Sequence, residues 1–287
     1  MPELPEVETV RRSLTPHLVG ETILSATLFR ADICETHDQR PATDDTLLAH
    51  ATIARIDRKG KQLALIATDG RVLNIHLGMS GQVLIRDQHP EATENHVHAL
   101  WTTSGSRAVM IFKDPRRFGG LWTFPTIDLL NERRWSLLGP DALDALPSVW
   151  APALRRGDRA VKAALLDQRA VAGVGNIYAD EALFRIGIRP TTRTKRLSIA
   201  ASLQLATTVR SVLAESVAAR GSTLRDYRDA DGFPGRQQLE HRVYGRSGQT
   251  CLTCGSRLRG GQVGQRTTVW CPKCQPSQTK HSERVKL

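Results

Sequence analysis

The chain has 287 residues and a formal net charge of +11, with 40 Lys and Arg against 29 Asp and Glu. This length leaves room for two or three domains with a substantial core. No run of 18 apolar residues occurs, and the acidic start does not resemble a signal peptide. These features argue against a membrane or exported protein, so we expect a cytoplasmic one, associated with the nucleoid if it is bacterial.

The charge is distributed unevenly along the chain. Residues 1–150 contain 16 Lys and Arg against 19 Asp and Glu, a net charge of −3. Residues 151–287 contain 24 against 10, a net charge of +14. A basic half next to a mildly acidic half indicates a polyanionic partner, DNA or RNA first. The alternative is a basic protein without such a partner, which the asymmetry makes less favourable.

The chain begins Met-Pro-Glu-Leu-Pro-Glu, and Pro2 is its most informative residue. Removal of Met1 would expose a secondary amine with a pKa of roughly 7.7–8.0, which is partly neutral at physiological pH. Such an amine can attack a carbonyl-like carbon and form a Schiff base, with Glu3 and Glu6 close by. The same segment is also typical of a helix start, with Pro5 suited to the first turn. Both interpretations can hold together.

The apolar pattern predicts one helix followed by strands. Val7, Val10, Leu14 and Leu18 recur at helical spacing, which predicts an amphipathic helix over residues 5–18. Short apolar runs separated by turns such as Thr68-Asp69-Gly70 then predict an antiparallel sandwich or barrel. The expected strands are 62–66, 72–76, 82–85, 97–101, 108–112 and 120–124. Together they indicate an α+β protein with an amino-terminal β-domain over residues 1–135.

The second half of the chain has a helical character. Residues 136–153 contain Gly139-Pro140, Pro147 and Pro152 and are expected to form a linker. Helices are predicted at 160–167, 176–184 and 198–219, within a domain over residues 154–240. Residues 241–275 carry clustered cysteines, and residues 276–287 are polar and basic, which predicts a disordered tail.

Four of the five cysteines are spaced as metal ligands. Cys251, Cys254, Cys271 and Cys274 follow the pattern C-x2-C-x16-C-x2-C, which is typical of a tetrahedral structural zinc site on a hairpin. Disulfides are the alternative, but nothing indicates an oxidising compartment. Cys34 is expected to be a plain, partly buried thiol.

Several turns carry residues with more than one interpretation. Met79 in HLGMSG, residues 76–81, could simply pack at a hairpin tip, and Asp114 in DPRRFG, residues 114–119, could pair with an arginine. Arginines and a Phe on such a turn also suit a wedge that enters a DNA stack. The basic turn at 58–61 is either a solvated cluster or a phosphate clamp. Asn176, after Gly173-Val174-Gly175, is either a helix N-cap or part of a phosphate site at a helix N-terminus.

Three histidines, His89, His96 and His98, form a second candidate metal cluster. The stretch is loop-like and lacks standard ligand spacing, so it is not favoured.

Taken together, the motifs resemble those of the formamidopyrimidine-DNA glycosylases. The PELPE start, HLGMSG, DPRRFG, KAALLDQ at 162–168, GVGNIYADEALF at 173–184 and the four-cysteine segment occur in the family's order, from residue 2 to about residue 275. The resemblance implies a β-sandwich with a leading helix, a linker, a helix–two-turn–helix domain and a zinc-bearing β-hairpin. It also implies a monomer that acts on double-stranded DNA with oxidised purines or abasic sites and cleaves the strand by β,δ-elimination.

The resemblance also assigns roles to individual residues. It implies that Pro2 is the nucleophile and Glu3 the general acid/base. Lys61 and Arg266 would orient phosphates and stabilise charge at the lesion. The expected DNA contacts are Lys162, Asn176, His76, Met79, Arg116 and Phe118, of which the last three would fill the gap left by a flipped base.

Two departures from the family pattern and three rival functions remain. Gln62 and Arg236 stand where aromatic residues are common in the family, and Arg236 is expected near the base pocket.

An endonuclease VIII-type enzyme for oxidised pyrimidines would share the mechanism, although the Glu-Leu-Pro-Glu opening favours the formamidopyrimidine branch. The second rival is a non-catalytic binder of damaged DNA, and the third is a general zinc-hairpin module that binds nucleic acid.

Overall fold

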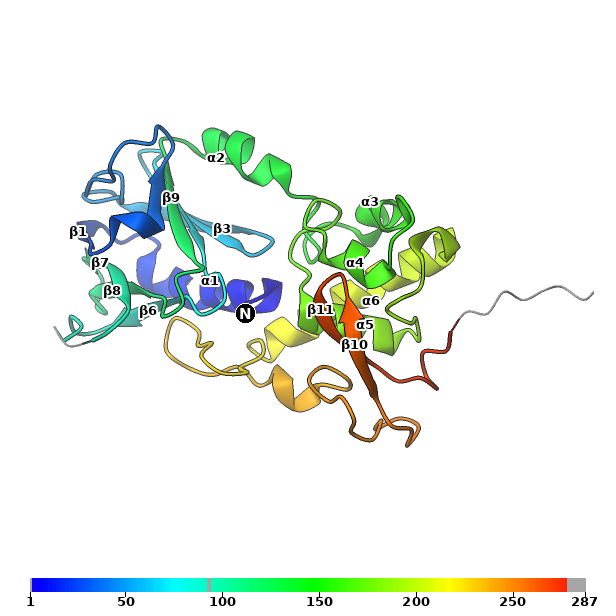
Figure 1. The fold of residues 1–287 in the computed structure, drawn as a ribbon. Helices are drawn as coiled ribbons and strands as arrows, with labels where there is room; N and C mark the ends of the chain where they lie inside the picture. Colours follow the sequence, from blue (N-terminus) through cyan, green and yellow to red (C-terminus); the bar gives the residue numbers. More distant parts are fainter. Residues whose placement is uncertain (1, 92–93, 278–287) are drawn as a thin grey trace, which may run out of the picture.

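Helix α1 (Leu4–Leu18) begins the fold and lies between two lobes (Figure 1). The computed structural model describes residues 2–91 and 94–277. Glu3 is the N-cap of α1, and the Glu3 and Glu6 side chains form a reciprocal capping box at its first turn. The lobe that contains the strands β1–β9 follows α1, and the helical lobe with the hairpin β10–β11 completes the chain.

Two sheets form the first lobe. The four-stranded sheet is antiparallel throughout, in the order β1-β7-β8-β6. The five-stranded sheet has the order β2-β9-β5-β4-β3, and only β2 and β9 pair in parallel. The strand bounds are β1 Ile23–Leu28, β2 Cys34–Thr36, β3 Ile53–Lys59, β4 Gln62–Ala67, β5 Val72–His76, β6 Gln82–Arg86, β7 Val97–Thr103, β8 Val109–Lys113 and β9 Gly120–Phe124. The structure therefore confirms the predicted antiparallel strands and adds β1, β2 and β3.

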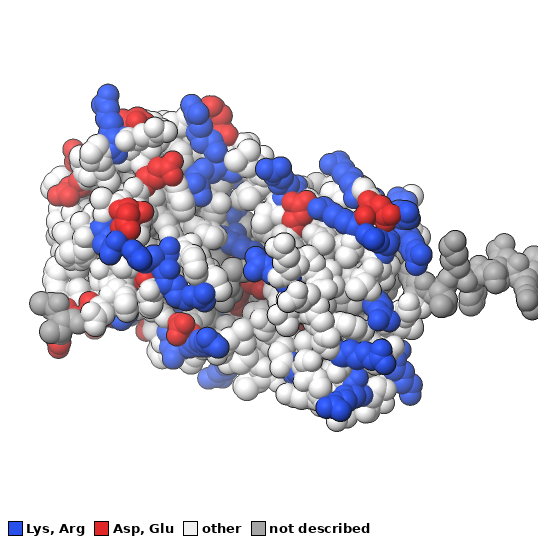
Figure 2. Space-filling view, viewed as in Figure 1, with Lys and Arg blue, Asp and Glu red and all other residues white. Residues whose placement is uncertain are grey.

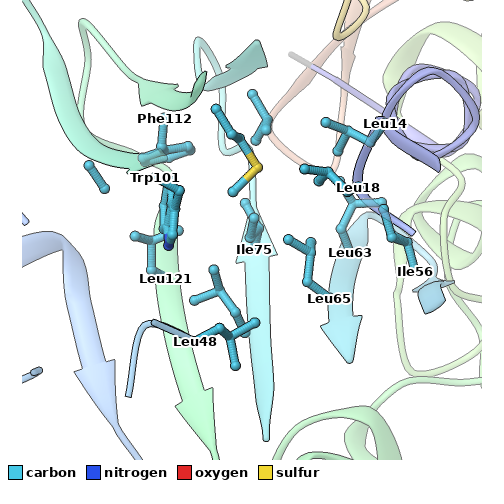
Figure 3. Close-up of a cluster of buried hydrophobic side chains, with 14 of the residues drawn as sticks. Leu14, Leu18, Leu48, Ile56, Leu63, Leu65, Ile75, Trp101, Phe112 and Leu121 are labelled. Carbon is cyan, nitrogen blue, oxygen red and sulfur yellow. The ribbon is translucent and has the colours of Figure 1, made fainter. Parts of the chain in front are cut away.

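The core of this lobe lies between the sheets. Trp101 and Phe112 from the four-stranded sheet and Leu63 and Ile75 from the five-stranded sheet belong to one buried cluster (Figure 3). The apolar face of α1 closes the cluster through residues such as Leu14. The outer face of the five-stranded sheet is covered by α2 (Ile127–Arg133) and Trp135. Alternate residues of the strands are thus buried on opposite faces, as two covered faces require.

The helical lobe has its own buried core. Its helices are α3 Pro147–Trp150, α4 Val161–Leu166, α5 Asn176–Arg185 and α6 Ile199–Ala218. The segment expected as a linker, 136–153, contributes to this core, because Ala142, Trp150 and Ala151 are buried in it. Leu4 at the start of α1 lies in the same core, whereas the rest of the helix packs on the sandwich.

The hairpin β10 (Arg259–Val263) and β11 (Arg266–Trp270) is antiparallel and packs on α5. The part of the predicted tail at 278–287 lies outside the described residues. No helix within 2–91 and 94–277 is long and apolar enough to cross a membrane.

Candidate functional site

Pro2 lies in the wall of a cavity of about 360 Å³ between the two lobes. Met79 and Arg116 line it from the first lobe, and Ser222 and Tyr244 line it from the second. Ser222 belongs to the loop after α6, which returns to the first lobe and buries Tyr227 in the sandwich core. Met1 lies outside the described residues.

The Glu3 carboxylate lies at the N-terminus of α5. The backbone N–H groups of Ile177 and Tyr178 donate to its two oxygens at 2.9 and 3.4 Å. A Cβ on Gly175 would lie 2.2 Å from Glu3 Cδ, so glycine is required for this approach. The helix N-terminus considered for a phosphate is therefore occupied by Glu3, and Gly175 rather than Asn176 is its N-cap.

Glu6 is a further buried carboxyl group beside Pro2, and the sequence motifs gave it no catalytic role. Its Oε2 accepts the Glu3 N–H at 2.8 Å, and its Oε1 accepts the Tyr178 hydroxyl at 2.5 Å and the Ser222 N–H at 2.6 Å. Burial and the nearby charge of Glu3 raise the pKa of Glu6 to about 7. The Glu-x-x-Glu spacing of the capping box is the sequence signal that could have placed both carboxyl groups at one site.

The turn between β3 and β4 brings Lys61 to the same site. Burial lowers the pKa of Lys61, while the charges of Glu3 and Glu6 act in the opposite direction. Asp141 fixes this turn from the second lobe, because it accepts the Gly60 N–H at 2.8 Å and pairs with Arg58 at 2.6 Å. The Arg58 side chain is 2% exposed, so this contact between the lobes is buried.

The two motif turns of the first lobe pack against each other. Ser80 donates to Asp114 Oδ1 at 2.6 Å and accepts the Arg116 N–H at 3.1 Å. A Cβ on Gly78 would lie 2.2 Å from the carbonyl carbon of Phe118, which explains this glycine. The Phe118 side chain remains 57% exposed, with the Arg116 guanidinium 5.0 Å from its ring centre. Of the three predicted wedge residues, Met79 and Arg116 line the cavity, and Phe118 lies next to Arg116.

His76 ends β5, close to Lys61. Burial is the main cause that lowers its pKa to about 4, and the charges of Lys61 and Arg134 add to this. The imidazole is therefore neutral near pH 7. Any contact with DNA would use a hydrogen bond rather than a charge.

Lys162 differs from the expected phosphate contact. Its side chain is 0% exposed, and its Nζ lies 2.7 Å from Asp180 Oδ1, 2.8 Å from Thr268 Oγ1 and 3.0 Å from the Thr267 carbonyl oxygen. The buried ammonium is thus saturated with protein partners and is not presented to DNA. It holds β11 against α4 and α5, with Asp180 also accepting the Val269 N–H at 3.1 Å.

Arg266 begins β11 and is exposed. Its charge acts on both Lys61 and Lys162, so it lies near these two lysines. Asn176 donates to the Thr267 carbonyl at 2.9 Å and therefore supports the same strand. Asn176 Oδ1 is buried without a partner among the described residues. A DNA phosphate contact by either residue stays a prediction.

The four cysteines of the hairpin segment form one group that can hold a metal ion. Their sulfur atoms all lie within 4.8 Å of one another, and Cys251 and Cys271 are buried. The Cys254–Cys271 and Cys251–Cys274 sulfur distances are 3.4 and 4.0 Å, and all five cysteines of the chain are free thiols. Metal–sulfur bonds of about 2.3 Å in a tetrahedron place sulfurs about 3.8 Å apart, so the donor set fits.

The three histidines and Cys34 belong to no group of possible metal ligands within residues 2–91 and 94–277. His98 is buried, with its Nε2 2.8 Å from the Asp114 carbonyl oxygen. Among the residues that the structure describes, the four cysteines are the only group of three or more His, Cys, Asp or Glu side chains that could hold a metal ion. Cys34 is partly buried, and burial raises the pKa of its thiol to about 11.

The two departures have different surroundings. Gln62 Oε1 accepts the indole N–H of Trp135 at 3.2 Å and so helps to fix the cover of the five-stranded sheet. Arg236 is exposed and is absent from the residues that line the Pro2 cavity. Neither departure alters the cavity wall.

Lys and Arg side chains from both lobes border the hollow between them (Figure 2). Arg116 and Arg225 also line the Pro2 cavity itself. This arrangement allows a polyanion to cross both lobes while one of its groups enters the cavity.

Comparisons with known proteins agree with this site. The profile of the formamidopyrimidine-DNA glycosylase N-terminal domain matches residues 1–121, and that of the H2TH domain matches residues 138–228. Formamidopyrimidine-DNA glycosylase of Xanthomonas euvesicatoria is 43% identical over 280 residues, covering 96% of this chain and all of the relative. That of Cupriavidus pinatubonensis is 41% identical over 288 residues, with the same coverage.

Solved structures give the same result. The MutM (Fpg) protein of Thermus thermophilus superimposes with a TM-score of 0.82 at 38% identity, covering 96% of this chain and 98% of the other. A variant of Lactococcus lactis Fpg in complex with DNA containing Fapy-dG gives 0.84 at 32% identity, covering 96% and 100%. Because both domains match and the relatives align over their full length, the chain belongs to the formamidopyrimidine-DNA glycosylase family.

Proposed function

We propose that this protein is a DNA glycosylase and abasic-site lyase that excises oxidised purines from double-stranded DNA. The single observation that carries the proposal is the placement of Pro2 in a cavity between the lobes, with two buried carboxyl groups beside it. Relatives in complex with Fapy-dG DNA and with carbocyclic 8-oxo-G DNA support this substrate class. The enzyme acts as a monomer in the compartment that holds the DNA, the cytoplasm.

The reaction begins with a base outside the helix, because its sugar bond is inaccessible within the stack. The free amine of Pro2 attacks the sugar C1′, and the base leaves with the electron pair of the broken bond. The nitrogen then loses its remaining proton to a base beside it, and Glu3 donates a proton to the sugar ring oxygen. The ring opens, and an iminium cation is left on Pro2. The iminium acidifies the C2′ hydrogens, so β-elimination expels the 3′ phosphate and a second elimination expels the 5′ phosphate.

Other residues bind the DNA and hold it in place. Lys61 and Arg266 supply positive charge for the phosphates beside the lesion, and Asn176 and His76 supply neutral hydrogen-bonding groups. Met79 and Phe118 fill the space of the displaced base, and Arg116 reaches the opposite base. Lys162 acts through β11, which carries Arg266, and makes no DNA contact of its own.

We infer that the metal at Cys251, Cys254, Cys271 and Cys274 is one structural zinc ion. Four thiolates with no position left for water are typical of structural zinc and not of catalytic zinc. The ion would fix the chain on either side of the β10–β11 hairpin. It takes no part in the chemical steps.

A panel of duplexes with single defined lesions, treated with borohydride, tests the function. We expect excision of 8-oxoguanine and formamidopyrimidines and a covalent adduct on residue 2. Excision of oxidised pyrimidines only would favour the endonuclease VIII type, and binding without any adduct would favour a non-catalytic binder. An adduct on Lys61 would overturn the assignment of the nucleophile.

A further inference from the structure

A continuous chain of buried side chains leads away from Pro2 through the second lobe. The Tyr178 hydroxyl lies 2.5 Å from Glu6 Oε1 and 3.2 Å from Ser222 Oγ. Ser222 Oγ in turn lies 3.1 Å from His241 Nε2. Tyr178 comes from α5, Ser222 from the loop after α6, and His241 from the segment that follows η5 (Gln237–Glu240). Four residues from four parts of the chain therefore form one hydrogen-bonded line.

Each member of this line can pass a proton, and water is largely excluded from it. Glu6 and Tyr178 are each 1% exposed, Ser222 is 4% exposed and His241 is 7% exposed. A hydroxyl group both donates and accepts, so Tyr178 and Ser222 can take a proton on one side and release one on the other. His241 is the end of the line nearest to solvent, since it has the largest exposed fraction.

Different charged and polar groups surround the two ends of the line. Glu6 is faced by Glu3 and Lys61, by the Tyr178 hydroxyl, and by Tyr227, whose hydroxyl donates to the Glu6 carbonyl oxygen. His241 is faced by Glu181, which stabilises an imidazolium, and by the edge of Tyr244. Burial lowers the pKa of His241, and Glu181 opposes this effect. The imidazole is thus neutral and able to accept a proton, which it can then release to solvent.

The proposed chemistry requires such an acceptor. When the Pro2 nitrogen bonds to C1′ and the base departs, the nitrogen becomes a tertiary ammonium that still carries one proton. That proton must leave before the nitrogen lone pair can expel the ring oxygen and form the iminium. Glu3 is occupied at that moment, because it donates to the ring oxygen. The Glu6 carboxylate is the other buried acidic group at the nucleophile, with its Oε2 on the N–H of the Pro2–Glu3 peptide bond.

We propose that Glu6, Tyr178, Ser222 and His241 form a proton relay that removes the proton of the Pro2 nitrogen. Glu6 takes the proton from nitrogen. The Tyr178 hydroxyl, which donates to Glu6 in this structure, turns toward Ser222, accepts a proton from Glu6 and gives its own to Ser222. The proton of Ser222 then moves to His241 Nε2. The result is a Glu6 carboxylate and a His241 imidazolium, with both hydroxyl groups restored and one proton moved. The relay rests on the Pro2 chemistry proposed above, and His241 acts in it only through Ser222.

The competing interpretation is that His241 only forms a structural hydrogen bond with Ser222. Two variants distinguish this interpretation from the relay. His241→Gln keeps a hydrogen-bonding group for Ser222 but does not take a proton near neutral pH, whereas His241→Leu removes both properties. Single-turnover excision of 8-oxoguanine is followed for each variant in mixtures of H2O and D2O, together with borohydride trapping and thermal unfolding. His17→Gln is the matched control, because His17 pairs with Asp231 at 2.9 Å outside this line.

We expect His241→Gln to be as slow as His241→Leu, at least about tenfold below wild type, with unchanged binding to an abasic-site analogue. A plot of the wild-type rate against the D2O fraction should be curved, because several protons move in the rate-limiting step. The same plot for His241→Gln should be a straight line. Full activity of His241→Gln with a curved dependence would overturn the relay alone. A wild type that forms no adduct on Pro2 would overturn both the relay and the proposed function.

Discussion

The Glu3 carboxylate accepts the backbone N–H of Ile177 at 2.9 Å, across 174 residues of sequence. The contact joins the N-cap residue of α1 to the N-terminus of α5, where the helix dipole stabilises a negative charge. A carboxylate held by backbone groups has little freedom to turn away from the cavity. Two glycines, Gly173 and Gly175, make this approach possible, since a Cβ on either would lie 2.3 Å or less from Leu4 or Glu3.

Gly175→Ala is therefore expected to abolish or nearly abolish excision. The added methyl group would lie 2.2 Å from Glu3 Cδ and would displace the carboxylate from Ile177. Single-turnover excision and thermal unfolding should be measured together. Gly157→Ala is the control for the general effect of replacing a glycine. Gly157 has a φ of +75°, so the alanine is strained there, but no atom lies within 4 Å of the added Cβ. Wild-type excision by Gly175→Ala would show that Glu3 is not held as described.

The rate of excision should fall at low pH, because Glu6 becomes protonated there. Its pKa is raised to about 7, so below that pH it holds a proton and cannot accept another. We expect the single-turnover rate to fall about tenfold per pH unit well below pH 7. The pKa of Glu6 is about 7 in the folded protein and 4.5 for an ordinary glutamate, so protonated Glu6 stabilises the folded state. This contribution to the free energy of unfolding is fully present below pH 4.5 and is lost as the pH rises through about 7. A rate that stays flat down to about pH 5.5 would contradict this assignment.

The cysteine group is expected to bind one zinc ion per chain. Cys271→Ser should release the metal and unfold the hairpin segment, because structural zinc binding is coupled to folding. DNA affinity should fall as Arg266 loses its position on β11, while the sandwich remains folded. Metal analysis of freshly purified protein and thermal unfolding check this. Cys34→Ser is the matched control, and freshly purified wild type without stoichiometric zinc would refute the prediction.

Asp180→Ala should destabilise the protein by about 3–5 kcal/mol, because it leaves the Lys162 ammonium buried without its carboxylate. Binding to damaged and undamaged DNA should weaken alike, since the strand that carries Arg266 loosens. Arg185→Ala provides the comparison: it breaks an exposed pair with Glu215 and should cost about 1 kcal/mol or less. Denaturant unfolding and DNA titrations measure both effects. Equal stabilities of the two variants would show that the buried pair does not hold β11.

Met79, Arg116 and Phe118 should affect the rate only of steps in which a base has to be displaced from the helix. Flipping costs a few kcal/mol, which Met79 and Phe118 can offset by filling the vacated space. Phe118→Ala and Met79→Ala are thus expected to slow excision from duplex DNA much more than cleavage at a pre-formed abasic site. Arg116→Ala should also reduce discrimination between opposite bases. Wild-type excision rates for all three variants would identify these residues as ordinary turn packing.

Local patterns were sufficient to predict much of the fold. The helical spacing of Val7, Val10, Leu14 and Leu18 gave α1, and alternation between turns gave the strands β4 to β9. Strand β2, three residues long and paired in parallel with the distant β9, has no local signal of this kind. Strands β1 and β3 have exposed residues at several positions, so their apolar runs are short.

The site was predicted where its residues lie in motifs and missed where it depends on tertiary contacts. The cysteine spacing identified the metal group, and the residues at the chain start identified the nucleophile that we propose. Lys162 was expected to contact DNA, but its Asp180 partner lies on another helix, and nothing in the local sequence shows that the pair is buried. His241 reaches Ser222 through the fold alone, at 19 residues of separation.

Helix α1 contributes Leu4 to the core of one lobe and Val7 and Leu14 to the core of the other. The core of the second lobe therefore includes a residue of α1, and the sandwich core includes Tyr227 from the loop after α6. Pro2, the nucleophile that we propose, precedes this helix, and the Glu3 carboxylate is held by α5 of the second lobe. A half-folded chain, during synthesis or after heat damage, lacks the assembled site and cannot cut DNA. The site thus exists only in the chain in which both lobes are folded.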